Sequence, residues 1–228
     1  MPNEIISYPE MCLQEGISLQ RGMNFGLRRN HSVVLMSVRP GAPYRDRLEE
    51  DGSVLIYEGH DETRKAKLNP KRVDQPELTP QGKFTQNGLF FRAAQEFKGG
   101  LRGPERVRVY EKIKQGIWSY NGVFHLVDAW KEHDGRRTVF QFRLLAVEGE
   151  EDFTAPPRID TQHRRLIPTA VKVEVWKRDA GKCVVCGATD ELQFDHDLPY
   201  SKGGTSFAAE NVQLLCARHN LQKHDRIL

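Results

Sequence analysis

The sequence predicts an α+β fold, with a twisted sheet or barrel and few helices in its N-terminal part and a small metal-bearing domain at its C-terminus. Runs of β-branched and aromatic residues, separated by turn-forming residues, fill much of the first 147 positions. Three of the four cysteines fall within the last 46 residues, where metal binding is the favoured interpretation. The fourth, Cys12, stands alone and is expected to be a small hydrophobic residue of a core.

The composition narrows the class of protein. The 228 residues include 34 Lys and Arg against 31 Asp and Glu, a formal net charge of +3. No apolar run approaches the roughly 20 residues of a membrane helix. The N-terminus carries Glu4 and Glu10 and lacks the apolar segment of a signal peptide. We therefore expect a soluble protein inside the cell that does not contact a membrane.

Five runs in the N-terminal part are typical of β-strands. They occupy residues 33–38, 53–57, 106–112, 122–130 and 138–147. Turn-forming pairs separate them at Asp51-Gly52, Asn121-Gly122 and Asp134-Gly135. One helix is predicted over 86–97, where the apolar face consists of Leu89, Ala93, Ala94 and Phe97.

A change in composition at 148–168 indicates a domain boundary. This stretch starts acidic, passes through two prolines, turns basic and ends at a third proline. Such a mixture is typical of an extended connector. We predict a first domain over 1–157, a linker over 158–168 and a second domain over 169–228 that begins with a short helix at 170–181. The first part holds 23 basic and 22 acidic residues and the rest 11 and 9, so bulk charge does not indicate DNA binding.

The C-terminal cysteines have the spacing of a zinc site. Cys183 and Cys186 form one pair, and Cys216 and His219 form a second pair after 29 intervening residues. Three thiolates and one imidazole complete a tetrahedral Zn²⁺ site, and Gly187 supplies the turn residue after the first pair. The span exceeds the roughly 12 residues of a DNA-reading finger. We expect a structural zinc ion that closes a longer loop, with two unrelated pairs in a core as the alternative.

That loop carries residues suited to phosphodiester hydrolysis. His196 is the natural general base, because its ordinary pKa lies close to neutrality. Asp195 and Asn220 supply oxygen ligands for a catalytic divalent ion, Mg²⁺ or Mn²⁺, at the scissile phosphate. Asp197 and His224 lie nearby without a defined role.

The motifs CxxCG, DHDLPxSKGG, ENVQLLC and CxxHN together resemble the zinc-bearing form of the HNH endonuclease family, over roughly 170–228. The resemblance implies a small ββα-metal fold and the same roles for Asp195, His196 and Asn220. It also implies that Asn211 holds the His196 side chain or its loop. One departure is His219, where many members have a fourth cysteine, and zinc accepts either ligand.

The N-terminal part contains the motifs GAPYRDRLEEDG at 41–52, LIYEGHD at 55–61 and YNGVF at 120–124. With these motifs it resembles the SRA (SET and RING associated) domain family over roughly 19–148. Where the family usually shows YDG this chain has Asn121, at a position that we expect to be a turn. The resemblance implies an SRA-like sheet or barrel that binds duplex DNA, flips a modified cytosine and holds it in a pocket.

Four residues within these motifs suit base recognition. Tyr44 and Tyr57 offer flat surfaces for the faces of a flipped base, with ordinary strand packing as the alternative. Asp46 can accept a hydrogen bond from the exocyclic amine of cytosine, and Glu58 is expected near the modification. Either phosphate contacts or solvated surface charges are expected at Arg28, Arg29, Arg45, Arg47, Arg64, Lys65 and Lys67.

Together, the two resemblances predict a modification-dependent restriction endonuclease. It would cut double-stranded DNA that contains 5-methylcytosine or 5-hydroxymethylcytosine, in the prokaryotic cytoplasm at the nucleoid. Because one HNH site cuts one strand, a homodimer is expected for a double-strand break. The alternatives are a zinc-stabilised reader of modified cytosine that does not cleave, a nuclease for a different modified base, and a purely structural zinc protein.

Overall fold

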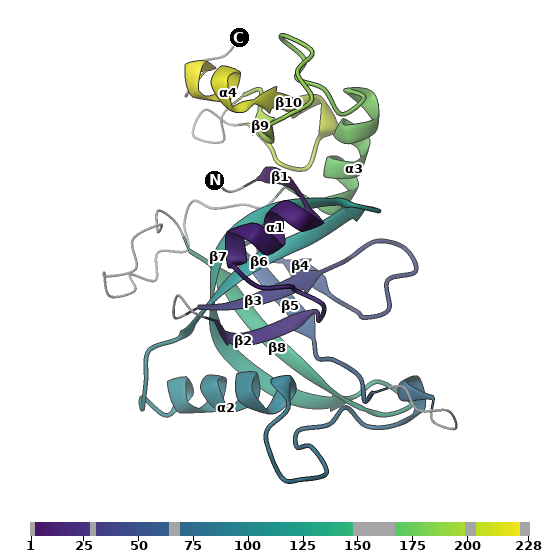
Figure 1. The fold of residues 1–228 in the computed structure, drawn as a ribbon, viewed down its shortest axis with the longest axis vertical. Helices are drawn as coiled ribbons and strands as arrows, with labels where there is room; N and C mark the ends of the chain where they lie inside the picture. The colour runs from purple at the N-terminus through teal and green to yellow at the C-terminus, as the bar shows by residue number, and fades with distance from the viewer. Residues whose placement is uncertain (1–2, 28–30, 64–68, 148–166, 199–203, 224–228) are drawn as a thin grey trace.

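The computed structural model describes residues 3–27, 31–63, 69–147, 167–198 and 204–223 (Figure 1). The strands in these ranges are β1 (Glu4–Ser7), β2 (Met23–Leu27), β3 (His31–Met36), β4 (Arg47–Glu49), β5 (Val54–Glu58), β6 (Glu105–Lys114), β7 (Ile117–His133), β8 (Thr138–Ala146), β9 (Leu192–His196) and β10 (Val212–Cys216). The helices are α1 (Tyr8–Glu15), α2 (Gln86–Lys98), α3 (Thr169–Arg178) and α4 (Ala217–Lys223). Short 3₁₀ turns occupy Glu50–Gly52, Pro70–Arg72 and Ala209–Asn211. None of the described helices is long and apolar enough to cross a lipid bilayer.

One path of paired strands runs in the order β10-β9-β1-β7-β6-β3-β2, and β8 and β5 branch from β7. The β3–β6 pair is parallel, whereas β7 is antiparallel to each of its neighbours. The first half of β7 pairs with β1 and β6 and its second half pairs with β8, so the sheet curls along this strand (Figure 1). The predicted α+β class is confirmed.

The five predicted strands are confirmed as β3, β5, β6, β7 and β8. The expectation that Asn121 lies in a turn is wrong, because Asn121 and Gly122 both lie inside β7. Pairing passes from Tyr110–Tyr120 to Val109–Gly122, which makes Asn121 the extra residue of a β-bulge. Gly122 adopts a positive φ of 93° there, a conformation that favours glycine. The Asn-Gly pair thus shapes a bulge, although it is a common hairpin signal.

The main core lies between α2 and the curled sheet. Thr85 caps the helix, its side chain accepting from the Gly88 amide, and the helix runs one residue beyond the predicted 86–97. The buried residues of its apolar face are Phe90, Ala93 and Ala94, whereas the predicted Leu89 and Phe97 are only half-buried. Phe90 sits at the centre because its ring meets those of Phe25 and Phe142 edge-on, at centroid distances of 5.2 and 5.9 Å.

The C-terminal part consists of the antiparallel β9–β10 pair with α3 and α4 beside it (Figure 1). The helix predicted at 170–181 forms over Thr169–Arg178. It stops short of the predicted end because Ala180 and Gly181 take positive φ values of 54° and 65°. The order of two strands followed by a helix agrees with the predicted ββα arrangement.

The two predicted domains share one sheet. The short strand β1 pairs with β7 on one side and, at Glu4–Gln193, with β9 on the other. Ile5 packs against both hydrophobic clusters of the C-terminal part. The boundary predicted at 157 and most of the predicted linker fall outside the described residues, so the division into domains stays a prediction.

Candidate functional site

The four predicted zinc ligands come together in space. Their donor atoms all lie within 4.8 Å of one another. His219 Nδ1 lies 3.4 Å from Cys183 Sγ and 3.3 Å from Cys216 Sγ, and the sulfurs of Cys186 and Cys216 are 3.9 Å apart. None of the four cysteines of the chain forms a disulfide. Three thiols and one imidazole converging on a point form a donor set that fits Zn²⁺.

Local backbone geometry positions these four candidate zinc ligands. Gly187 has a positive φ of 76° and its amide donates to the Cys183 carbonyl at 2.8 Å, which folds the first pair into a tight turn. The second pair spans the end of β10 and the first turn of α4. Burial raises the pKa of the Cys183 thiol, but backbone N–H donors from Cys216, Cys186 and Val185 outweigh it and lower the pKa to about 6. A thiol with a depressed pKa is readily deprotonated for metal binding.

The predicted general base lies at the end of β9. His196 Nε2 is 2.9 Å from the hydroxyl of Ser206, a residue that is 1% exposed. Burial lowers the pKa of His196, Asp195 opposes this effect, and Lys223 adds to it. The ring is therefore neutral at pH 7, the form that can accept a proton.

Asn211 acts on the loop that follows His196. Its Oδ1 accepts from the Leu198 amide at 2.8 Å, and its Nδ2 donates to the carbonyls of Leu198 at 3.1 Å and Thr205 at 3.0 Å. Gly204 is essential for the close approach of the chain to Leu198, because a Cβ at that position would lie 1.8 Å from the Leu198 carbonyl oxygen. Of the two roles expected for Asn211, these contacts correspond to holding the loop.

The two predicted ligands of the catalytic ion lie on facing elements, Asp195 on β9 and Asn220 on α4. Asp195 Oδ2 is 2.5 Å from the ammonium of Lys223, which is buried and also donates to the His196 carbonyl. Asn220 donates from Nδ2 to Gln193 Oε1. The second carboxylate oxygen of Asp195 and the amide oxygen of Asn220 have the hard-donor chemistry that suits Mg²⁺ or Mn²⁺, so the residues fit such an ion.

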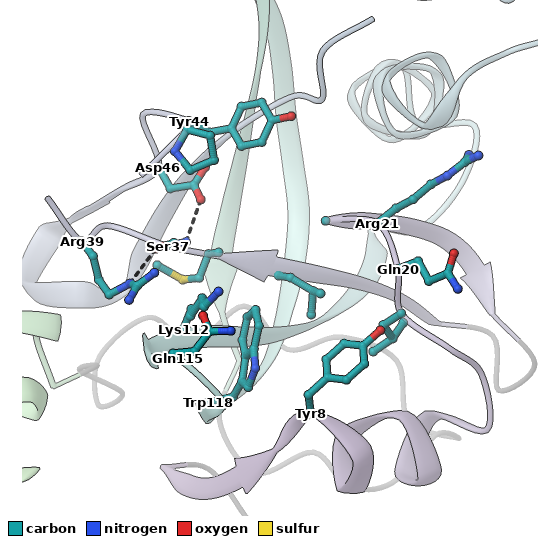
Figure 2. A pocket seen from close by; sticks show the side chains of 16 residues that line it. Tyr8, Gln20, Arg21, Ser37, Arg39, Tyr44, Asp46, Lys112, Gln115 and Trp118 are labelled. Atoms are coloured by element: carbon teal, nitrogen blue, oxygen red, sulfur yellow. Dashed lines mark hydrogen bonds between the residues drawn. The ribbon is translucent and has the colours of Figure 1, made fainter. Parts of the chain in front are cut away.

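A separate cavity of about 630 Å³ opens in the N-terminal part, and we call it the Tyr44 cavity (Figure 2). Its lining combines aromatic, basic and acidic side chains on β3, β6, β7, α1 and the loop before β4. The lining residues include Tyr8, Arg21, Met36, Arg39, Tyr44, Asp46, Lys112 and Trp118. Figure 2 shows Tyr44 and Asp46 on one side, across from Trp118 and Tyr8.

Two of the four predicted base-pocket residues, Tyr44 and Asp46, line this cavity. Asp46 is 9% exposed, and its two oxygens accept from the amides of Ser37 at 3.0 Å and Glu58 at 3.1 Å. Burial raises the pKa of Asp46 to about 7, against the opposing effect of these two backbone donors. Each carboxylate oxygen has a second lone pair that can accept from a ligand.

Tyr44 is held in place by its neighbours. The ammonium of Lys71 lies 4.2 Å from the centroid of the Tyr44 ring and 2.8 Å from Asp61 Oδ2, and it also donates to the Pro43 carbonyl. The Asp61 amide lies 3.4 Å from the Tyr44 hydroxyl. A cation over an aromatic face stabilises the ring in that orientation.

The other two predicted pocket residues, Tyr57 and Glu58, lie behind the cavity wall on β5. Tyr57 is 3% exposed and donates to the carbonyl of Gly22, which itself lines the cavity. Glu58 is 4% exposed and accepts from the Arg45 amide at 2.9 Å and from Arg137 Nη2 at 3.2 Å. Neither side chain is among those that line the cavity, and their roles in recognition stay predictions.

Of the seven predicted phosphate contacts, the structure describes two. Arg45 is exposed, and Arg47 pairs at its surface with Glu49 at 2.8 Å. Outside the described residues lie Arg28, Arg29, Arg64, Lys65, Lys67 and also His224.

Cys12 is half-buried beside a hydrophobic cluster, as expected for a small apolar side chain, and its sulfur accepts from the Leu19 amide at 3.4 Å.

Several residues of both sites were missed by sequence reasoning. Ser206 and Lys223 contact His196 and Asp195, but single serines and lysines carry no spacing signal. Tyr8 lies on α1, a helix that the sequence does signal. Ser7 and Glu10 form a capping box, and Pro9 stands at the helix start.

One family model matches the C-terminal part of the chain. Residues 183–226 match the HNH endonuclease family model, a range that includes the zinc ligands and the candidate catalytic residues. The predicted HNH endonuclease module is thereby confirmed. No curated protein matches the chain.

Solved structures similar to the chain include SRA domains and a restriction enzyme. The SUVH5 SRA domain in a hemimethylated CG DNA complex is 23% identical with a TM-score of 0.43, over 68% of this chain and 89% of that one. The same domain bound to fully hydroxymethylated CG DNA is 21% identical with a TM-score of 0.43, over 68% and 90%. The modification-dependent TagI restriction endonuclease is 18% identical with a TM-score of 0.45, over 97% and 76%.

Proposed function

We propose that this protein is a DNA endonuclease whose cleavage depends on a modified cytosine, 5-methylcytosine or 5-hydroxymethylcytosine. The observation that carries the proposal is the presence, on one continuous sheet, of an HNH module and a separate cavity lined by aromatic, acidic and basic side chains. In this proposal the HNH module supplies hydrolysis and the Tyr44 cavity supplies selectivity for modified DNA.

Recognition requires that a base leave the stack and enter the cavity. Unstacking costs a few kcal/mol, and stacking on an aromatic ring returns about 1–3 kcal/mol per base. Tyr44 offers the ring, and Asp46 accepts from the exocyclic amine of the cytosine. Tyr57 and Glu58 shape the cavity from behind, through Gly22 and the Arg45 amide. Backbone phosphates are neutralised by cations at the cavity, namely Arg21, Arg39 and Lys112.

Hydrolysis is assigned to the residues around β9. His196 takes a proton from the attacking water, and the hydrogen bond with Ser206 holds the ring in place. Asp195 and Asn220 would hold a Mg²⁺ or Mn²⁺ ion, which when bound neutralises the phosphoryl oxygens and stabilises the leaving oxygen. Lys223 orients the Asp195 carboxylate through an ion pair of 2.5 Å.

The test compares matched plasmids that carry cytosine, 5-methylcytosine or 5-hydroxymethylcytosine, with Mg²⁺ or Mn²⁺ present. We expect cleavage of one or both modified plasmids and not of the unmodified plasmid. His196→Ala should lower the cleavage rate by roughly 10²–10⁴-fold while binding to modified duplex is kept. Equal cutting of all three plasmids would exclude modification dependence, and an active His196→Ala protein would exclude His196 as the base.

We further propose that a homodimer assembles on DNA, because one HNH centre hydrolyses one strand. At low protein concentration the product should be nicked plasmid, and linear product should appear as the concentration rises. A linear product that forms in proportion to protein at all concentrations would contradict dimer-dependent cutting.

A second candidate is a zinc-stabilised reader of modified cytosine that does not cleave. It is favoured by one observation, the buried Lys223 ammonium at 2.5 Å from the Asp195 carboxylate, where a divalent ion is expected. Titration of the wild-type protein with Mn²⁺ separates the two candidates, because only the nuclease gives nicks. Competition binding with duplexes that carry other modified bases tests whether the cavity selects a different modification.

A further inference from the structure

A buried polar cluster joins α3 to the β6–β7 hairpin, and we call it the Lys172 junction. Its five side chains, each 7% exposed or less, are Glu111, Ser119, Asn121, Thr169 and Lys172. Lys172 Nζ lies 2.7 Å from both Glu111 Oε2 and Asn121 Oδ1, and 3.3 Å from Ser119 Oγ. Thr169 donates to the second oxygen of Glu111. Every proton of the ammonium and both carboxylate oxygens therefore have partners inside the cluster.

The junction contains one cation, one anion and three neutral groups. Asn121, the bulge residue of β7, donates from Nδ2 to Glu111 Oε2 at 3.0 Å and accepts from Lys172 through Oδ1. An aspartate at this position would place a second buried carboxylate beside Glu111 and leave a net negative charge. A buried ion pair that loses one partner leaves an unpaired charge, so this geometry strongly favours one docked position of α3.

A second, independent contact holds the same two parts together. The Phe194 amide of β9 donates to the Asn3 carbonyl at 3.1 Å beside the β1–β9 pairing. On α3, the Trp176 ring lies 5.3 Å from the ammonium of Lys114, which is on β6. Contacts at separate points on β9 and α3 fix the orientation of the HNH module as well as its distance from the sheet.

The junction also lies directly behind the Tyr44 cavity. Met36 lines the cavity, and its sulfur is 3.9 Å from Asn121 Nδ2. Lys112 and Trp118 line the cavity from the same β6–β7 hairpin that supplies the junction residues. The element that forms one wall of the cavity is therefore the element to which the nuclease module is attached.

We propose that the Lys172 junction sets where the DNA is cut, by holding the HNH module at a fixed position relative to the base in the Tyr44 cavity. This inference rests on the proposed function. Lys172, Glu111 and Asn121 are positioning residues in it, since they touch neither the base nor the scissile phosphate. A rigid junction gives a narrow range of distances between the modified base and the cut.

The test maps DNA ends by sequencing after full-length protein cuts a duplex with a single modified cytosine. Lys172→Met should spread the cuts over a wider range and lower cutting at the wild-type positions roughly 10–100-fold, because misplaced catalytic groups act slowly. Affinity for the modified duplex should be kept, because Lys172 is not among the residues that line the cavity. The matched control is Lys177→Met, at an exposed position of the same helix.

A second variant covers the case in which Lys172→Met fails to fold. Lys172→Met combined with Glu111→Gln leaves no unpaired buried charge, and it should fold, keep its zinc and show the same spread of cuts. A folded variant of either kind with the wild-type cut positions would overturn the proposal.

Amide hydrogen exchange gives a readout that does not need cleavage. The α3 amides should exchange faster in the Lys172 variants than in wild type or Lys177→Met. If the wild-type protein does not distinguish modified from unmodified DNA, the proposed function is wrong. Hydrogen exchange would in that case still show whether the junction holds α3 in place. Unchanged protection of α3 in the folded variants would show that the junction does not fix the module.

Discussion

The nuclease centre and the Tyr44 cavity are built in opposite ways. The zinc ligands and the catalytic candidates all fall between Cys183 and Lys223, on two adjacent strands, one helix and their loops. The cavity instead takes its lining from positions between Tyr8 and Trp118, which only the curled sheet brings together. A local centre can be closed by one metal ion, whereas a dispersed cavity depends on the whole N-terminal core. Loss of the nuclease centre should therefore leave the Tyr44 cavity intact, and loss of the cavity should leave the nuclease centre intact.

The largest expected effect comes from the zinc ligands. Cys216→Ser removes one thiolate, and in zinc-finger peptides metal binding supplies about 10 kcal/mol or more of folding free energy. We expect loss of bound zinc and of all cleavage, with binding to modified duplex retained. Metal analysis, plasmid nicking and fluorescence anisotropy measure the three properties. Cys12→Ser is the matched control, since Cys12 lies in a different cluster. If Cys216→Ser loses both binding and cleavage, the Tyr44 cavity is not independent of the nuclease centre.

Tyr44→Ala should weaken binding to modified duplex and leave the nuclease centre folded. Loss of a stacking ring costs about 1–3 kcal/mol, which corresponds to roughly a 5–150-fold weaker affinity for modified duplex. The zinc content should not change. Tyr44→Phe keeps the ring and should bind within a few-fold of wild type. If alanine and phenylalanine weaken binding equally, the hydroxyl and not the ring face is what matters.

Asp46 should make the cavity sensitive to pH. Burial raises its folded-state pKa from the ordinary 3.8 to about 7, so the ionised acceptor forms only as the pH rises through about 7. Affinity for modified cytosine should therefore increase from about pH 6 to about pH 8 in the wild type, and Asp46→Asn should show a flatter profile. Binding is measured without divalent ions, so that cleavage does not interfere.

The same shift has a consequence for stability. The stabilisation linked to protonated Asp46 is fully present below about pH 4 and is lost as the pH rises through about 7. Relative to wild type, Asp46→Asn should therefore gain a few kcal/mol over that interval in urea unfolding. An unchanged difference between the two proteins over the same interval would mean that Asp46 is ionised throughout.

The smallest expected effect lies in the nuclease centre. Ser206→Ala removes the 2.9 Å contact to His196 Nε2, and one hydrogen bond contributes about 0.5–1.5 kcal/mol, or roughly 2–10-fold in rate. Single-turnover cleavage should slow by that factor with unchanged binding. Thr205→Ala alters the exposed neighbouring residue and serves as the control. An unaffected Ser206→Ala rate would show that the loop, and not the hydroxyl, holds the ring.

The same contrast explains what the sequence could predict. Cys183, Cys186, Cys216 and His219 carry their function in their spacing, and the structure brings them together. Strands with alternating apolar residues could be predicted for the same reason, because a period of two can be recognised within a single segment of the sequence. Ligand spacing and strand periodicity are both local properties.

Contacts between distant segments could not be predicted in this way. Lys172 lies in a segment that is predicted only as a short helix, yet its side chain is fully buried against Glu111. Asn121 reads as a turn residue, but the register shift between β6 and β7 makes it part of a strand. Tyr57 is predicted either to stack on a base or to pack within a strand, and the pairing of β5 with β8 places it in the core behind the cavity wall. Each outcome depends on which strands become neighbours.

The place of β1 also sets an order of assembly. Its partner β7 precedes its other partner, Gln193 of β9, in the chain, so β7 is synthesised first. Since domains fold from the N-terminus during synthesis, the cavity-bearing part can form while the cutting module is still unfinished. The free edge of β1 then serves as the template on which β9 docks. A nascent chain would thus complete the Tyr44 cavity before it completes the HNH module.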